Sequence, residues 1–283
     1  MLKSFIQRLV DFFLFSSLYI ALCAVIMIYQ TCELLLHTPP GFVLICFVFF
    51  STICSYNFHW YLTPESLTSS RRIQWTQHHK GLHLIFYFIG LIGSAVCFFM
   101  MREHWIAMAF AAFVTFLYSA PKLPQDFFKA LKEIAIGKTI FLAIVWTYVT
   151  TMLPIFVQGK NWQMEYSLFA CSRFFLIYAI CIPFDYRDRE DDKQAGVRSM
   201  ITLLNERGID YLFFFSLLLF AVTTTMLSLY NYSVYAIIIL LIPGLITALL
   251  YNYSKKNFSD YLYYFVLDGL MMLSALLMMI FGI

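Results

Sequence analysis

The chain of 283 residues is too apolar and too poor in charge to be a soluble globular protein. Hydrophobic residues make up 61% of it, charged residues 12%, and its mean hydropathy is +0.77, whereas soluble domains are about half apolar and a quarter charged. Its net charge of +3 is spread over separate segments and gives no indication of nucleic-acid binding. Because helices satisfy their own backbone hydrogen bonds in lipid, this composition predicts an all-α integral membrane protein.

Nine apolar stretches approach the length of about 20 residues that a helix needs to cross a bilayer. In chain order they cover residues 12–32, 39–57, 82–101, 104–120, 137–158, 166–184, 211–230, 232–253 and 261–283. No linker or soluble segment separates them. The sequence therefore predicts one membrane domain over residues 1–283, a polytopic bundle of nine transmembrane helices.

The charge of the connecting segments alternates along the chain. Of the 19 lysines and arginines, all except Arg102, Lys160 and Arg173 lie before the first span or in the second, fourth, sixth and eighth connections with their borders. The positive-inside rule places these segments in the cytoplasm. The N-terminus is then cytoplasmic and the C-terminus outside, in an inner or plasma membrane.

Three charged side chains fall at or within spans. Asp11 stands at the start of the first span, at the interface. Arg173 and Asp268 lie inside the sixth and ninth spans, where a charge is costly and usually faces a partner or a cavity. The two could pair with each other, or each could line a cavity.

An acidic segment, "FDYRDREDDKQAGVRSM" (Phe184–Met200), directly follows the sixth span. On a continuing helix, Asp185, Asp188 and Asp192 would share a face. Carboxylates so close repel one another unless a cation lies between them, and Mg²⁺ is commonly held by one or two carboxylates plus substrate phosphates. The interleaved Arg187 and Arg198 suit those phosphates. A solvated loop with internal salt bridges would have the same composition.

The order of residues in this segment resembles the second aspartate-rich motif of the UbiA-type intramembrane prenyltransferases. The matching residues are Asp188, Asp192, Lys193, Gly196, Arg198 and Ser199. The Arg187–Asp188 pair looks most like the menaquinone-branch members. "LYSAPKL" (Leu117–Leu123) resembles the family's segment before the fifth span.

This resemblance implies Mg²⁺-dependent transfer of an isoprenoid group from a prenyl diphosphate to an aromatic or other lipophilic acceptor. It implies that Asp185, Asp188 and Asp192 are catalytic and hold the metal. Arg187, Arg198, Lys122 and Lys138 are then candidates for contact with the diphosphate. The two lysines could equally serve only to orient the fifth span.

The first aspartate motif, expected after the second span, departs from the family pattern. In "YNFHWYLTPES" (Tyr56–Ser66), Phe58 and Tyr61 stand where the family has aspartates. The resemblance implies that the retained Asn57 and Glu65 complete the metal and substrate site. Arg72, with Arg71, could offset the lost metal charge through guanidinium hydrogen bonds.

Three interpretations follow from the sequence. The first is a prenyltransferase with an altered diphosphate site, favoured by the intact second motif. The second is a non-catalytic member of the same fold that binds a lipid or a partner, favoured by the altered first motif. The third is a small-molecule carrier with a coincidental acidic loop, disfavoured because the two halves show no convincing repeat.

Overall fold

The computed structural model describes residues 2–63, 70–119, 138–194 and 199–282, and within them all regular structure is helical. Eight helices of this described part are long and apolar enough to cross a membrane. They comprise α2 with η1 (Leu18–Thr31, Cys32–Leu36), α3 (Phe42–Tyr61), α5 (Lys80–Met100), α8 with η5 and α9 (Lys138–Thr147, Tyr148–Met152, Leu153–Val157), α10 (Met164–Arg187), α13 with η6 (Glu206–Thr225, Met226–Tyr230), α14 (Val234–Ser254) and η7 with α15 (Leu262–Leu267, Asp268–Phe281). The predicted all-α, polytopic membrane fold is confirmed.

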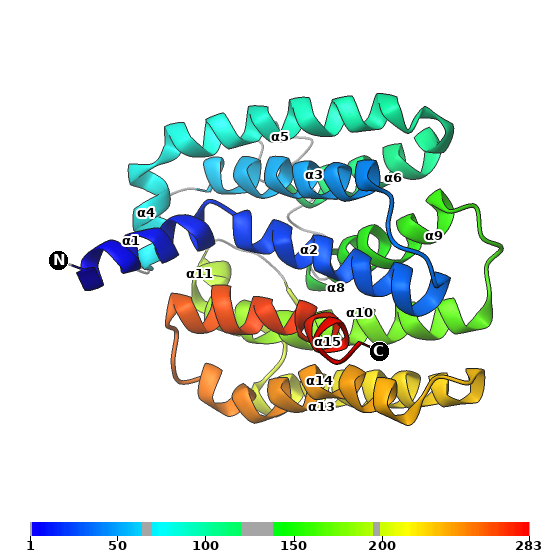
Figure 1. The fold of residues 1–283 in the computed structure, drawn as a ribbon. Helices are drawn as coiled ribbons and strands as arrows, with labels where there is room; N and C mark the ends of the chain where they lie inside the picture. Colours follow the sequence, from blue (N-terminus) through cyan, green and yellow to red (C-terminus); the bar gives the residue numbers. More distant parts are fainter. Residues whose placement is uncertain (1, 64–69, 120–137, 195–198, 283) are drawn as a thin grey trace.

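The stretch predicted as the first span is divided between two helices. α1 (Leu2–Phe15) ends two residues before α2, and Ser17 between them has a left-handed backbone with φ 70°. A residue with a side chain rarely adopts this conformation, which breaks the helix. α1 exposes Phe5, Ile6 and Leu9 and lies beside one end of the bundle (Figure 1). The first membrane-length helix therefore starts at Leu18 and not at residue 12.

The fourth predicted span corresponds to α6 (Trp105–Ser119), which follows a short 3₁₀ turn, η2 (Arg102–His104). Its 15 helical residues correspond to about 22 Å of length, less than the roughly 30 Å of a hydrocarbon core. α6 packs against α3, α8 and α9 like the other bundle helices. It accounts for the difference between nine predicted spans and eight helices of membrane length in the described part.

The helices close into a ring. α2 packs on α3, α3 on α6, α6 on α8, α8 on α10, α10 on α15, and α15 again on α2. Outside this ring, α5 packs on α3, and α13 and α14 pack on α10 and α15 (Figure 1). The outer helices expose large apolar side chains such as Ile92, Phe215 and Leu249, as a surface in contact with lipid requires. The ring leaves its polar residues on the inside or at its ends.

Arg173 joins three elements of the ring in the interior. Its guanidinium donates to the hydroxyls of Thr31 and Thr151 and to the carbonyl of Thr150, and also to the Met27 carbonyl and the Gln30 amide oxygen. These groups belong to α2 and to the π-helical segment η5. No ion pair joins Arg173 to Asp268, both of which the structure describes, so the pairing that the sequence allowed as one of two alternatives is not formed. Arg173 instead holds α2, η5 and α10 together.

Most of the site residues predicted from the sequence and placed by the structure lie at one end of the bundle, which we call the charged end. There α3 and α10 end, α8 and η7 begin, and two short helices lie, α4 (Arg71–His78) and α11 (Arg189–Gln194). α1, α4 and α11 mark this end on the left of Figure 1. α12 (Met200–Leu203) connects it to α13.

Candidate functional site

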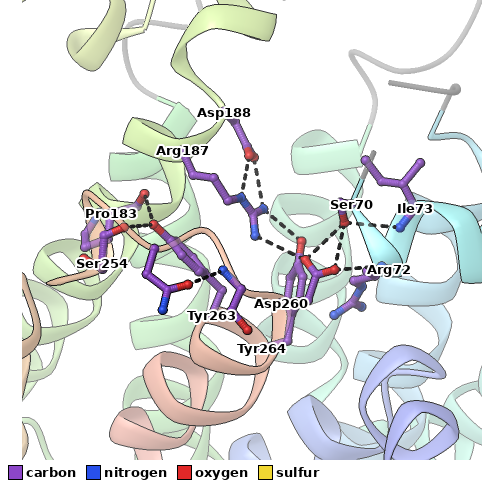
Figure 2. Close-up of polar contacts among 12 residues, drawn as sticks. Ser70, Arg72, Ile73, Pro183, Arg187, Asp188, Ser254, Asp260, Tyr263 and Tyr264 are labelled. Atoms are coloured by element: carbon purple, nitrogen blue, oxygen red, sulfur yellow. Dashed lines mark hydrogen bonds and ion pairs between the residues drawn. The ribbon is translucent and has the colours of Figure 1, made fainter. Parts of the chain in front are cut away.

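The side chain of Asp260 anchors α4 at the charged end. Its carboxylate accepts hydrogen bonds from the Ser70 hydroxyl, at 3.1 Å, and from the backbone N–H of Arg72, at 2.9 Å (Figure 2). Ser70 in turn accepts from the N–H of Ile73 as the N-cap of α4. Because the first N–H groups of a helix need partners, Asp260 fastens α4 to the start of the last membrane helix and so fixes the position of Arg72.

The Arg72 side chain is buried between aromatic rings. It is 3% exposed, and its guanidinium carbon lies 4.0 Å from the centre of the Trp60 ring and 4.1 Å from that of Tyr264. Burial lowers the pKa of Arg72, while Tyr264 and nearby aspartates raise it; arginine nevertheless remains charged at neutral pH. Within the described part of the chain, this guanidinium makes no hydrogen bond and no ion pair, and its Nε is fully buried. A buried donor without a partner is costly, so the arrangement is suited to receiving oxygen atoms of a ligand.

A second guanidinium, that of Arg187, lies against the same tyrosine. Its carbon is 5.1 Å from the centre of the Tyr264 ring, and Nη2 donates to the Tyr264 hydroxyl at 2.9 Å. Nε donates to Asp188 at 2.8 Å, and Nη1 lies 3.9 Å from Asp260 (Figure 2). Arg72 and Arg187, which come from opposite halves of the sequence, therefore meet at Tyr264.

The predicted second motif lies where α10 passes into α11. Asp185 is buried in the last turn of α10 and accepts a hydrogen bond from the Thr139 hydroxyl of α8. Asp188 follows α10 with its side chain 46% exposed and paired with Arg187. Asp192 lies in α11, and its backbone N–H donates to the Asp188 carbonyl at 2.9 Å. Asp188 thus lies on the side of the α10–α11 junction that faces Arg187 and Tyr264.

Asn57, from the first motif, uses its side-chain amide to hold neighbouring helices together. It is fully buried in the last turn of α3, and its amide nitrogen donates to the carbonyls of Ser16 and Ile53 at 3.1 and 2.8 Å. Its amide oxygen lies 2.7 Å from Nδ1 of His83 in α5. Both ends of the amide are therefore used to join α3 to α5 and to the break between α1 and α2.

A small apolar cavity lies inside the ring, among α2, α3, α6 and α8. Its volume is about 50 Å³, and Tyr56 and Trp146 are among its lining residues. The Trp146 indole N–H donates to the Tyr56 hydroxyl at 3.1 Å. Tyr56 directly precedes Asn57, so the cavity reaches toward the charged end. A prenyl chain is larger than this volume, and its entry would require the lining side chains to move.

A comparison with protein families identifies the fold. The sequence model of the UbiA prenyltransferase family matches residues 63–267, which is most of the chain. The chain belongs to the UbiA prenyltransferase family. This confirms the resemblance seen in the second motif. No curated protein matches the chain closely enough to be reported.

The UbiA match begins at Thr63, beyond Asn57 and the two substituted positions of the first motif. It includes Arg72, the whole second motif and the last helix as far as Leu267. The two substituted positions of the first motif therefore lie outside the match.

UbiA-family prenyltransferases generally depend on a divalent metal, and the residues present fit one in part. Among the described residues, no three acidic, histidine or cysteine side chains converge as a metal cluster. Asn57 does not fit as a ligand because its amide oxygen is already occupied by His83. Asp188 and Asp192 fit the mode in which Mg²⁺ is held by one or two carboxylates together with substrate phosphates.

For the remaining predicted site residues the structure shows fewer contacts or none. Lys138 is the first residue of α8, next to Thr139 and thus at the charged end. Glu65, Lys122 and Arg198 lie outside the described residues. Arg71, adjacent to Arg72, is half-exposed and pairs with Asp11 at 2.6 Å.

Three contributors to this site were not predicted from the sequence as site residues. Trp60 is one of many aromatic residues near the end of a predicted span, and Tyr264 does not stand out among 19 tyrosines. Asp260 is the one of the three whose sequence position could have suggested a role, because it is an acid directly before an apolar span. A polar residue at the entry of a span is common, so only the contact with α4 distinguishes it.

Proposed function

We propose that this UbiA-family protein transfers an isoprenoid group from a prenyl diphosphate to an aromatic or other lipophilic acceptor inside the membrane, with Mg²⁺ as cofactor. The observation that carries the proposal is the convergence of Arg72, Arg187 and Asp188 at one end of a closed ring of apolar helices. An anionic head group at that end and an apolar tail within the ring would match this division of polarity.

In this proposal the diphosphate lies at the charged end. The guanidinium of Arg72, which makes no hydrogen bond to a described residue, donates to its oxygens. Arg187 of the second motif stabilises the same charge, and Lys122, Lys138 and Arg198 add further contacts. Asp185, Asp188 and Asp192 hold the metal together with Glu65. Asn57 keeps α3 in place and does not bind the metal.

The chemistry needs stabilisation of a leaving anion and protection of a cation. As the carbon–oxygen bond of the donor breaks, both electrons leave with the diphosphate, and fixed guanidinium groups stabilise that growing charge. A bound Mg²⁺ would supply further neutralisation of the diphosphate. The apolar interior keeps water from the allylic cation, and the faces of Tyr56 and Trp146 can stabilise it.

The test is diphosphate release by purified protein in proteoliposomes, supplied with labelled farnesyl or geranylgeranyl diphosphate. We expect release that requires Mg²⁺ and that falls on the order of 100-fold in Asp188→Asn and Asp192→Asn, as for loss of a group that stabilises transition-state charge. Glu190→Gln is the matched control, because Glu190 is exposed and, among the residues that the structure describes, pairs with Lys193 alone. Release that is indifferent to Mg²⁺ and to these changes would contradict the proposal.

A non-catalytic role is the second candidate, and the environment of Asn57 favours it. Where the family has the start of a metal-binding motif, this chain uses the amide to join helices. Binding of prenyl diphosphate without any release of diphosphate would support this alternative. Flux of a solute into the same proteoliposomes, with neither binding nor release, would support a carrier.

A further inference from the structure

Asp268 is an acidic side chain inside the ring that no other role accounts for. It is the first residue of α15, one turn beyond Tyr264. Within the described part of the chain, its carboxylate accepts no hydrogen bond and has no cation within 4 Å. The residue is partly buried. Asp260, by contrast, accepts from the Ser70 hydroxyl and the Arg72 backbone N–H, and Asp11 accepts from the Arg71 and Tyr261 side chains. An acid kept at membrane depth without a partner is a candidate functional residue.

The surroundings of Asp268 supply a matching donor. Arg72 and Arg187 lie within electrostatic reach of it, as do Tyr19 and Cys23 of α2, and the Tyr19 hydroxyl lies against the neighbouring Gly269. Arg72 and Asp268 do not touch each other, yet both have unfilled hydrogen-bonding capacity. With the oxygens of the diphosphate on Arg72, an acceptor beside it that presents a proton to Asp268 would complete both.

The local backbone holds Asp268 firmly in this position. The π-helical segment η7 directly precedes it, and such segments are frequent at functional sites. The Tyr19 hydroxyl donates to the Phe265 carbonyl of η7 at 2.8 Å. At Gly269 a side chain carbon would lie 2.3 Å from the same hydroxyl oxygen, so glycine permits α2 and α15 to approach closely next to Asp268.

We propose that Asp268 is the catalytic base that takes the proton of the acceptor during prenyl transfer. This rests on the proposed function. The bond from the allylic carbon to the diphosphate oxygen breaks, and its electron pair leaves with the diphosphate. An electron pair of the acceptor forms the new bond to that carbon. The proton that the acceptor loses passes to a carboxylate oxygen of Asp268 and later to water, which restores the carboxylate.

The first experiment separates departure of the diphosphate from capture of the prenyl group. Tritiated geranylgeranyl diphosphate is incubated with the protein and with the total lipid extract of its native membranes as the acceptor source. In Asp268→Asn we expect transfer to the extract to fall by about 100-fold or more, the usual contribution of a positioned base. Diphosphate release should continue, with the label recovered as the free alcohol formed by water. Asp268→Glu should restore part of the transfer.

Two other results would contradict the role of Asp268, and only the second would also contradict the proposed function. If Asp268→Asn transfers as well as the unaltered protein, or if release and transfer fall together, Asp268 is not the base, and the proposed function stands. If the unaltered protein releases no diphosphate, the proposed function fails and the role of Asp268 fails with it.

The second experiment does not depend on turnover. Dicyclohexylcarbodiimide, an apolar reagent for carboxyl groups, should modify Asp268, as read by mass spectrometry of its peptide, because this carboxylate is only partly buried and has no hydrogen-bond or ion-pair partner among the described residues. A non-reactive thiolodiphosphate analogue of geranylgeranyl diphosphate should abolish the modification. Asp260, which Ser70 and the Arg72 N–H enclose, is the control and should stay unmodified. Absence of modification at Asp268 would overturn the inference.

Discussion

Two neighbouring arginines at the charged end have opposite environments. Arg71 is half-exposed and paired with Asp11, whereas Arg72 is buried between the rings of Trp60 and Tyr264 and forms no ion pair with any described residue. Both were suggested by the sequence as replacements for lost metal charge. The structure separates them, because only a guanidinium with free donors can bind a substrate oxygen without first breaking an ion pair.

We therefore predict that Arg72→Gln lowers prenyl transfer on the order of 100-fold, through loss of electrostatic stabilisation of the leaving group. Arg71→Gln, the adjacent control, should leave transfer close to that of the unaltered protein. Steady-state rates with labelled prenyl diphosphate in proteoliposomes measure both. Equal effects of the two substitutions would mean that Arg72 has no special role.

Arg173 illustrates a buried charge with a structural purpose. Its five hydrogen bonds join α2, η5 and α10. Replacement by Met should cost about 2–3 kcal/mol, since hydrogen bonds to charged groups are lost from a buried position. Arg173→Lys should recover little of this, because an ammonium cannot reproduce the planar fork.

The measurement for Arg173 is thermal unfolding in detergent. Arg102→Met, which removes an exposed arginine of η2, is the control and should leave the midpoint unchanged. Equal midpoints for the Arg173 and Arg102 variants would show that the network does not contribute to stability.

At the scale of elements, α4 depends on a residue from the far end of the sequence. Asp260→Ala removes the acceptor for the N–H of Arg72 and for the Ser70 hydroxyl. Loss of such a helix-capping acceptor costs about 1 kcal/mol, or roughly fivefold faster amide exchange in α4. Hydrogen exchange read by mass spectrometry checks this. Asp210→Ala removes contacts to Tyr251 and Lys255 of the α13–α14 pair instead, and it should leave exchange in α4 unchanged.

Element by element, the sequence predicted most of the fold and less of the site. Apolar length identified the spans, and the order of acids and bases identified the α10–α11 junction. The break at Ser17 was missed because the apolar pattern continues through it. The pairing of Arg72 with Trp60 and Tyr264 was missed because three segments distant in sequence create it. Asn57 was expected at a metal, yet its amide is used by His83 and two carbonyls, contacts that only tertiary packing reveals.

At the scale of the whole molecule, the orientation in the membrane remains a prediction from charge. Alkaline phosphatase, which is active only outside the cytoplasm, should be active when fused after Arg102 or after Lys160 and inactive when fused after Lys256. The first two positions share a side only if the short α6 crosses the membrane. Opposite activities at Arg102 and Lys160 would therefore show that α6 does not cross.

The central claim is that the charged end of the ring, between Arg72 and the α10–α11 junction, binds the diphosphate of a prenyl donor. The most direct measurement is an experimental structure with Mg²⁺ and a thiolodiphosphate analogue of geranylgeranyl diphosphate. The account predicts the diphosphate in contact with the guanidinium groups of Arg72 and Arg187, beside Asp188, with the prenyl chain directed into the ring past Tyr56. A diphosphate bound elsewhere, with Arg72 still unpartnered, would contradict it.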